Sequence, residues 1–126
     1  MEGKLIFYFV PVHDLQKAIE LYRDTLGFTE TWREGEYTVS FSLPGSDVEL
    51  MIEQMTEGSP TVAGPVFLVP SVNQVILQYQ QKLDFVSEPT ETPDGLWISA
   101  KDDSGNGLYF TDESKIEASH TGINVS

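Results

Sequence analysis

The stretch DLQKAIELYRDTLGF, residues 14–28, decides the fold of this chain because its pattern occurs twice. Asp14 is a suitable N-cap for a helix, and Gly27 suits the left-handed conformation that ends many helices. Between them, the apolar residues follow the spacing of one helix face: Leu15, Ala18, Ile19, Tyr22 and Leu26. We therefore predict a helix over residues 14–28 whose apolar stripe faces a core.

The same pattern returns 57 residues later, in SVNQVILQYQQKLDF at residues 71–85. At this offset Tyr22 matches Tyr79 and Phe28 matches Phe85, in register with the aliphatic positions. Two amphipathic helices match by chance at aliphatic positions, but much less often at both aromatic ones. We interpret the repeat as a duplicated structural module, with a second helix predicted over residues 71–85.

Strand-like segments surround both predicted helices. An apolar run precedes each helix, at residues 5–12 and 65–70, and short strand-like pieces separated by turn residues follow it. Each half therefore indicates a βαβββ module within one α+β domain, residues 1–126. The predicted parts are a first module (4–55), a linker of small and breaking residues (56–63), a second module (64–113) and a polar tail (114–126) that is either loosely held or packed on a partner chain.

The composition argues against several classes of function. Twenty Asp and Glu against seven Lys and Arg give a net charge of −13, which disfavours binding to nucleic acid. The charge either maintains solubility or attracts a cationic ligand. No apolar run has the roughly 18 residues of a membrane span, no signal peptide is evident, and there is no cysteine for disulfides or thiolate chemistry. Together these features predict a cytoplasmic protein with no membrane partner.

The stretch DDSGNGLYF, residues 102–110, has two readings: a cation-binding loop or a tight turn before a last strand. Asp102 and Asp103 lack the alternating ligand spacing of a calcium loop. The run Gly105-Asn106-Gly107 instead supplies residues that tolerate positive φ angles. We predict a hairpin turn here.

Residues 14–28 and 102–110, set in two βαβββ modules, resemble the vicinal oxygen chelate superfamily. That group includes glyoxalase I, extradiol dioxygenases, fosfomycin-resistance enzymes and bleomycin-resistance proteins. The second stretch looks like the family's Asp-Pro-Asp-Gly-Asn turn with its proline replaced, and the resemblance covers about residues 4–113. It implies two curved sheets that together form a cup, and a homodimer.

The resemblance also implies where a metal enzyme of this family would carry its ligands. The four positions fall on Phe7, Glu49, Gly64 and Tyr109, and only Glu49 is an ordinary ligand of a divalent cation. Catalytic zinc wants three protein ligands, and iron dioxygenases want two His and a carboxylate. We therefore predict no metal cofactor; the alternative is a single divalent metal at Glu49.

Strand alternation predicts which residues line the cup. The predicted ligand-binding residues are aromatic or acidic for the most part: Phe7, Phe9, Trp32, Phe41, Glu49, Met51, Trp97 and Tyr109. Such a pocket suits a flat, apolar ligand, neutral or cationic, held by stacking and by attraction to the acid. The alternative for each aromatic residue is a core position, and for Glu49 an exposed edge of a sheet.

Three functions remain open at this point. The first is a metal-independent binding protein of the bleomycin-resistance-like branch, with no catalytic residues, which sequesters an aromatic or cationic small molecule. The second is an atypical glyoxalase-like lyase or dioxygenase, with Glu49 as metal ligand or general base and Tyr109 as proton donor. The third is a scaffold whose aromatic residues fill the cup.

Overall fold

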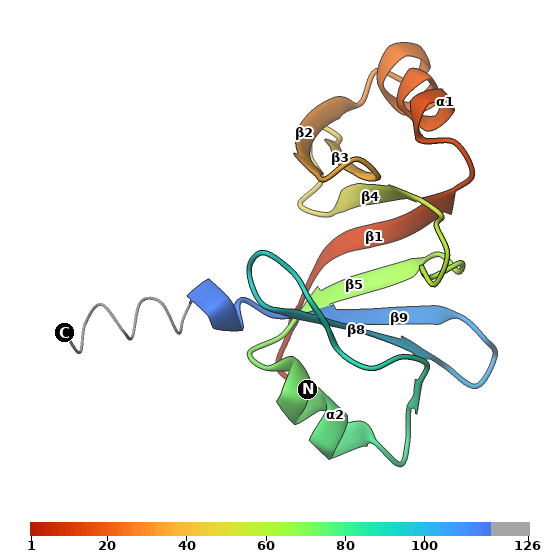
Figure 1. Cartoon of the computed structure of the whole chain (residues 1–126). Coiled ribbons are helices and arrows are strands. Elements are labelled where there is room, and N and C mark those ends of the chain that lie inside the picture. Colours follow the sequence, from red (N-terminus) through yellow and green to blue (C-terminus); the bar gives the residue numbers. More distant parts are fainter. Residues whose placement is uncertain (117–126) are drawn as a thin grey trace. The chain divides into compact units, whose positions relative to one another are not determined.

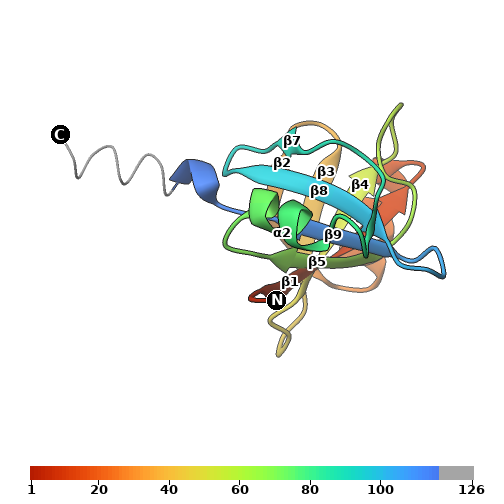
Figure 2. The same cartoon turned by 90° about the horizontal axis from the view of Figure 1, so that it is seen from below.

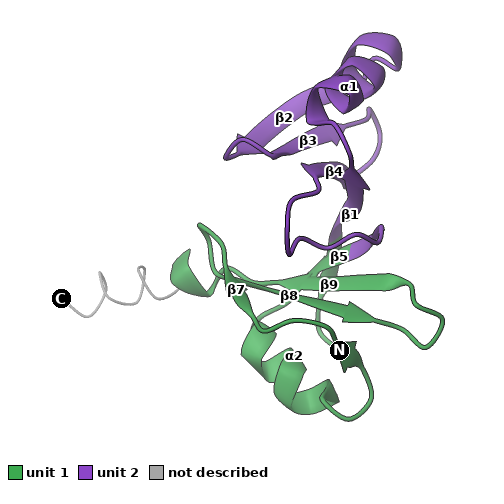
Figure 3. Cartoon of the chain, turned by 45° about the vertical axis from the view of Figure 1, so that its right-hand side comes forward, with its two compact units in different colours: residues 1–5, 66–126 green, residues 6–65 purple. Residues whose placement is uncertain are grey.

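The structure is a computed structural model that describes residues 1–116 (Figures 1 and 2). Residues 117–126, which hold His120 and most of the predicted tail, lie outside the described residues. The chain forms two compact units (Figure 3). Unit 2 is Ile6–Pro65, and unit 1 joins Met1–Leu5 to the residues from Val66 onward.

Unit 2 contains one helical segment and a four-stranded mixed sheet. Its elements are β1 (Lys4–Val12, whose first two residues belong to unit 1), α1 (Leu15–Ile19), the π-helical turn η1 (Glu20–Thr25), β2 (Thr29–Glu34), β3 (Thr38–Ser42) and β4 (Glu49–Gln54). The strand order is β2-β3-β4-β1. Neighbours are antiparallel except for β1 and β4, which are parallel, so the first and last strands of the module pair with each other.

Unit 1 repeats this connectivity. Its elements are β5 (Gly64–Leu68, whose first two residues belong to unit 2), α2 (Val72–Tyr79), β6 (Asp84–Phe85), β7 (Thr90–Glu91), β8 (Leu96–Lys101) and β9 (Gly107–Thr111). Again the first and last strands, β5 and β9, are parallel, while β8 is antiparallel to β9 and to both short strands. Helix α2 covers one face of this sheet (Figure 2). The predicted α+β class is confirmed, and the predicted βαβββ order recurs, with two short strands, β6 and β7, in place of one between α2 and β8 in unit 1.

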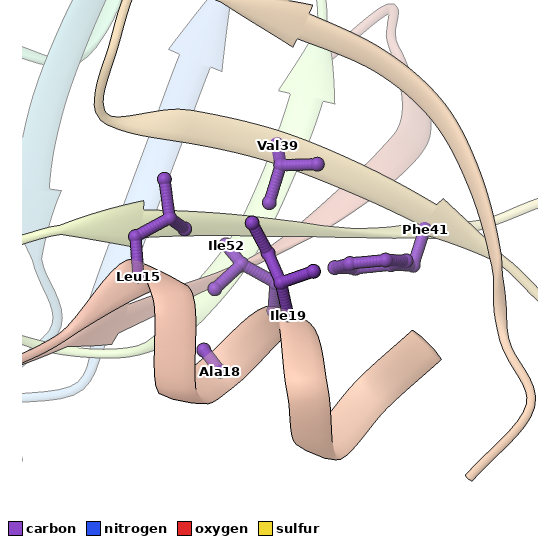
Figure 4. Close-up of a cluster of buried hydrophobic side chains, with 6 residues drawn as sticks. All are labelled: Leu15, Ala18, Ile19, Val39, Phe41 and Ile52. Carbon is purple, nitrogen blue, oxygen red and sulfur yellow. The ribbon is translucent and has the colours of Figure 1, made fainter. Parts of the chain in front are cut away.

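The core of unit 2 lies between α1 and the sheet (Figure 4). Residues of the predicted stripe meet strand residues there, and the cluster consists of Leu15, Ala18, Ile19, Val39, Phe41 and Ile52. Three of its large side chains, Ile19, Phe41 and Ile52, are at most 2% exposed. Burying such a side chain contributes about 1.5–3 kcal/mol, so this cluster anchors the helix to the sheet.

The first helix does not keep its α-helical spacing to the end. After Ile19 the chain widens into the π-helical turn, in which the Leu26 N–H donates to the Leu21 carbonyl at 2.9 Å. The extra residue in this turn rotates Leu26 away from the core, and Leu26 is 51% exposed. Its predicted place on the apolar stripe is therefore wrong, whereas Gly27 has the predicted left-handed φ of 78°.

The second helix is shorter than predicted. It ends at Tyr79, whose carbonyl accepts the N–H groups of Lys82 and Leu83, both at 2.9 Å. Residues 84–85, predicted as its end, instead form β6 and pair with β8. Residues 80–82 are all polar, and Asp84 lacks the conformational freedom of Gly27.

Each helix is capped from two sides. Asp14 and Ser71 accept N–H groups of the first turns of α1 and α2, as predicted, both at 3.2 Å. A second acceptor lies at the end of the last strand in unit 2 and directly after the last strand in unit 1. The Gln54 Oε1 accepts the Leu15 N–H at 3.0 Å in unit 2, and Asp112 Oδ2 accepts the Val72 N–H at 2.8 Å in unit 1.

The stretch 102–106 is a turn stabilised by its own first residue. Asp102 Oδ1 accepts the N–H groups of Ser104 and Asn106 at 2.9 and 2.8 Å, and its Oδ2 accepts the Asn106 side-chain amide at 2.9 Å. These bonds, that from the Asn106 amide above all, lower the pKa of Asp102. The carboxylate is thus satisfied within the turn, as the turn prediction requires. Among the described residues, no helix has the length and apolar character needed to cross a membrane.

Candidate functional site

The candidate site lies on the sheet of unit 2, on the face that α1 does not cover. Val10 and Val12 of β1 pack against the core beneath α1. Because strand residues alternate between faces, Phe7 and Phe9 project to the other side. The parallel register sets Phe7 beside Glu49 of β4 and Phe9 beside Met51.

Trp32 reaches the same face through an irregularity in β2. The register with β3 shifts between Glu30 and Trp32, so Thr31 is an extra residue on that strand. As a result, both Thr31 and Trp32 contact groups on the open face. The Trp32 ring meets the Phe7 ring edge to face, with centroids 5.5 Å apart and an interplanar angle of 71°.

The Glu49 carboxylate is held by two hydroxyl groups. Its Oε1 accepts the Thr31 hydroxyl at 2.6 Å and the Ser40 hydroxyl at 2.7 Å. Ser40 is fully buried, and Glu49 is half-buried. The acid therefore has a fixed orientation beside the half-buried rings of Phe7 and Trp32.

The two arginines of unit 2 are engaged with acids outside this site. Arg33 makes a two-pronged contact with Glu30, at 2.9 and 3.1 Å, and Arg23 pairs with Asp24 and Glu30. Within residues 1–116, no Lys or Arg lies at ion-pair distance from Glu49. The half-buried carboxylate thus has no compensating positive charge from the described part of the chain.

A second acid, Glu53, lies further along the same face of β4. Its Oε1 accepts the Thr38 hydroxyl at 2.8 Å. Partial burial raises the pKa of Glu53, the Thr38 hydrogen bond opposes this rise, and the negative charge of Glu34 adds to it. The open face of unit 2 therefore carries two acids, each bonded to a hydroxyl group of β3.

Unit 1 carries a different pair of aromatic rings on the face opposite α2. The Trp97 and Tyr109 rings stack with centroids 5.3 Å apart, and the Trp97 Nε1–H donates to the Ser99 hydroxyl at 3.2 Å. Tyr109 is only 2% exposed.

Several predicted ligand-binding residues are buried. Phe41 is the clear correction: it is 0% exposed and packs in the core beneath α1, because its strand phase turns it toward the helix. Phe9 and Met51 lie on the open face of unit 2 but are only 1% and 8% exposed. The residues that unit 2 brings together at accessible positions are Phe7, Trp32 and Glu49.

Comparison with known protein families agrees with this architecture. A family model described as the glyoxalase/bleomycin resistance protein/dioxygenase superfamily matches residues 4–110. The chain belongs to this superfamily. Members of the superfamily bind small molecules, and many form dimers. None of the curated proteins that were compared matches the chain.

Solved structures show the same superfamily fold. Methylmalonyl-CoA epimerase from Mycobacterium tuberculosis is 19% identical, with a TM-score of 0.69 over 90% of this chain and 91% of the epimerase. A glyoxalase/bleomycin resistance protein/dioxygenase superfamily member from Vibrio splendidus is 16% identical, with a TM-score of 0.60 over 88% and 99%. A hypothetical protein from Bacillus halodurans is 14% identical, with a TM-score of 0.69 over 89% and 95%. At these identities the likeness concerns the fold alone.

The residues at the superfamily's metal-ligand positions do not form a ligand set. Phe7 and Gly64 carry no donor atom in their side chains, and Tyr109 stacks on Trp97. Glu49 supplies one carboxylate, whose Oε1 is already used by two hydroxyls. In the part of the chain that the structure describes, no three His, Cys, Asp or Glu residues gather closely enough to hold a metal ion. This donor set does not fit the three-ligand centres of metal enzymes.

The sequence prediction missed both hydroxyl groups that orient Glu49. Ser40 lies between Val39 and Phe41, and the alternation of β3 places it on the open face, so the pattern contained a usable signal. Thr31 had no such signal, because it reaches Glu49 only through the irregularity in β2.

A hollow of about 310 Å³ beside α1, lined in part by His13 and Leu21, contains none of the predicted ligand-binding residues.

Proposed function

We propose that this protein is a metal-independent binding protein, which holds a small, flat aromatic cation on the open face of unit 2 and releases it unchanged. The observation that carries the proposal is the half-buried Glu49 carboxylate, which lies beside the Phe7–Trp32 ring pair and has no basic partner among the described residues. A carboxylate and two aromatic rings supply the two attractions that such a cation needs.

The charge of the whole chain supports the same ligand class. A net charge of −13 raises the local concentration of cations and speeds their association at low ionic strength. We further propose that the protein is cytoplasmic and that it forms a homodimer; many members of its superfamily form dimers. Light scattering coupled to size exclusion tests the dimer directly.

Tryptophan fluorescence tests the binding proposal, because each unit holds one tryptophan. Cationic aromatic compounds are titrated into the Trp97→Phe variant, which reports on Trp32, and into Trp32→Phe, which reports on Trp97. We expect saturable quenching of Trp32, and recovery of the unchanged compound by chromatography. Saturable quenching of Trp97 alone would place binding on the other unit and contradict the proposal.

A metal-content measurement tests the enzymatic alternative. The protein is incubated with zinc, nickel, manganese and ferrous ions, desalted and analysed for bound metal. Metal independence predicts no stoichiometric retention. About one equivalent per chain, absent from Glu49→Gln, would overturn it in favour of a lyase or dioxygenase that uses Glu49.

A further inference from the structure

The Glu49 carboxylate has one oxygen in use and one available. The Ser40 and Thr31 hydroxyls each hold a single proton, and both reach Oε1. Thr31 also lies 3.2 Å from the Ser40 carbonyl, but its proton goes to the nearer, charged acceptor at 2.6 Å. No hydrogen bond from residues 1–116 reaches Oε2. The site therefore holds the acid still while leaving one charged acceptor for a ligand.

The surroundings decide what kind of group can use that acceptor. The register partner of Glu49 is Phe7, whose ring contacts Trp32 edge to face, so a ligand ring packed on these side chains lies next to the carboxylate. A charged acceptor beside a half-buried aromatic surface favours a donor that carries both a positive charge and an N–H group. A quaternary ammonium group offers the charge but no proton to donate.

We infer that this site selects aromatic cations whose positive charge lies on an N–H donor attached to the ring, such as amidinium groups, over quaternary ammonium ions of equal charge. The inference rests on the proposed function and makes it narrower: the charge of Glu49 supplies attraction, and its free Oε2 supplies selectivity. Thr31 and Ser40 are positioning residues, since they act on the ligand only through Glu49.

Three probes with the same ring system separate these contributions: 2-naphthamidinium, 2-naphthyltrimethylammonium and neutral 2-naphthamide. Their dissociation constants are measured by calorimetry at pH 7 and fixed ionic strength. We expect the amidinium to bind at least about tenfold more tightly than the quaternary ion, since hydrogen bonds to charged groups are the stronger class. The neutral amide should bind most weakly.

Variants locate the selectivity. In Glu49→Gln the ratio between the two cations should fall to about one, whereas Glu36→Gln, which removes an equal charge from an exposed turn of the same unit, should keep the wild-type ratio. In Thr31→Val and Ser40→Ala the carboxylate keeps its charge but loses its fixed orientation. The ratio should therefore fall by several fold while binding of the quaternary ion changes little.

The outcomes distinguish this inference from the proposed function. Equal affinity of the two cations, with both weakened in Glu49→Gln, would overturn the N–H selectivity and leave the binding function standing. A selectivity that survives in Glu49→Gln would overturn it as well, because another group would then read the N–H donor. If none of the three probes binds, both the inference and the proposed function fail for this ligand class.

Discussion

Replacing Asp112 by Asn tests the account of how unit 1 is held together. Asp112 lies directly after β9, is 2% exposed, and accepts hydrogen bonds from three parts of the chain. Its Oδ2 accepts the Val72 N–H at 2.8 Å, and its Oδ1 accepts the Leu96 N–H at 2.9 Å. Oδ1 also accepts the hydroxyl and N–H of Ser114, at 2.8 and 3.2 Å. The carboxylate thus joins the start of α2, the start of β8 and the segment after β9.

The cost of Asp112→Asn follows from these contacts. Asparagine has the same shape but only one acceptor oxygen, so its amide would face either the Val72 N–H or the Leu96 N–H. A buried donor left unsatisfied costs about 1–3 kcal/mol. Loss of a negative charge at a helix N-terminus adds about 0.3–1 kcal/mol. We expect the free energy of unfolding to fall by about 1.3–4 kcal/mol, which corresponds to a Tm lower by roughly 4–16 °C.

The assay is urea denaturation at pH 7, followed by circular dichroism. Asp103→Asn, an exposed change in the 102–106 turn, is the matched control and should stay within about 0.5 kcal/mol of wild type. A change of that small size in Asp112→Asn would refute the reasoning, because the carboxylate would then not be carrying the contacts described above.

The pH dependence of stability in wild type and Asp112→Asn gives a second test of the Asp112 hydrogen bonds. Burial alone would raise the pKa of Asp112, but its hydrogen bonds, first that from the Val72 N–H, outweigh this and lower it. A lowered folded-state pKa means that the contribution is present above the unfolded pKa of about 3.9 and is lost as the pH falls through the folded value. The stability gap between wild type and Asp112→Asn should therefore narrow below about pH 4.

Three further changes test other parts of the structure. Gly95→Ala would bring a Cβ into the Asp112 carboxylate and backbone, so we expect a loss of about 1–3 kcal/mol in a urea titration, and a loss under 0.5 kcal/mol would contradict the packing. Glu53→Gln should raise the Tm at pH 7, because the pKa of Glu53 is raised in the folded state and its charged form is disfavoured there. The gain should vanish below about pH 4, where the wild-type side chain is neutral in both the folded and the unfolded state. A lower Tm of the variant at pH 7 would contradict this account. Leu26→Gln should change stability by under about 0.5 kcal/mol and Ile19→Ala should cost about 2–5 kcal/mol; equal losses would argue against the π-helical turn.

Much of the fold was predictable because the sequence pattern of one module occurs twice in the chain. The 57-residue repeat of aliphatic and aromatic positions predicts two copies of one module, and the observed strand pairing repeats accordingly. The errors fall where local geometry departs from an ideal period. The π-helical turn moves Leu26 off the core stripe, and α2 stops at Tyr79 because tertiary pairing of residues 84–85 with β8 replaces the last helical turns.

The candidate site was predictable in part, for a similar reason. Strand alternation and the resemblance together placed Phe7 and Glu49 on one face, and the register of β1 and β4 sets them side by side. Phe41 was misassigned because its strand phase was uncertain, and the structure turns it into the core. Thr31 could not be anticipated, since a one-residue irregularity in a strand leaves no periodic mark in the sequence.

The pairing of first and last strands within each unit has a consequence for how the chain is made. Phe7 lies beside Glu49 and Val66 beside Tyr109, so each sheet is completed only by residues more than forty positions away. Bringing ends that far apart together costs about 3 kcal/mol in the length-dependent part of the loop-closure entropy. On the ribosome, unit 2 has its closing strand once residue 54 has emerged, while unit 1 must wait for residue 111. We expect the duplicated chain to fold in two steps during synthesis, with unit 2 formed first.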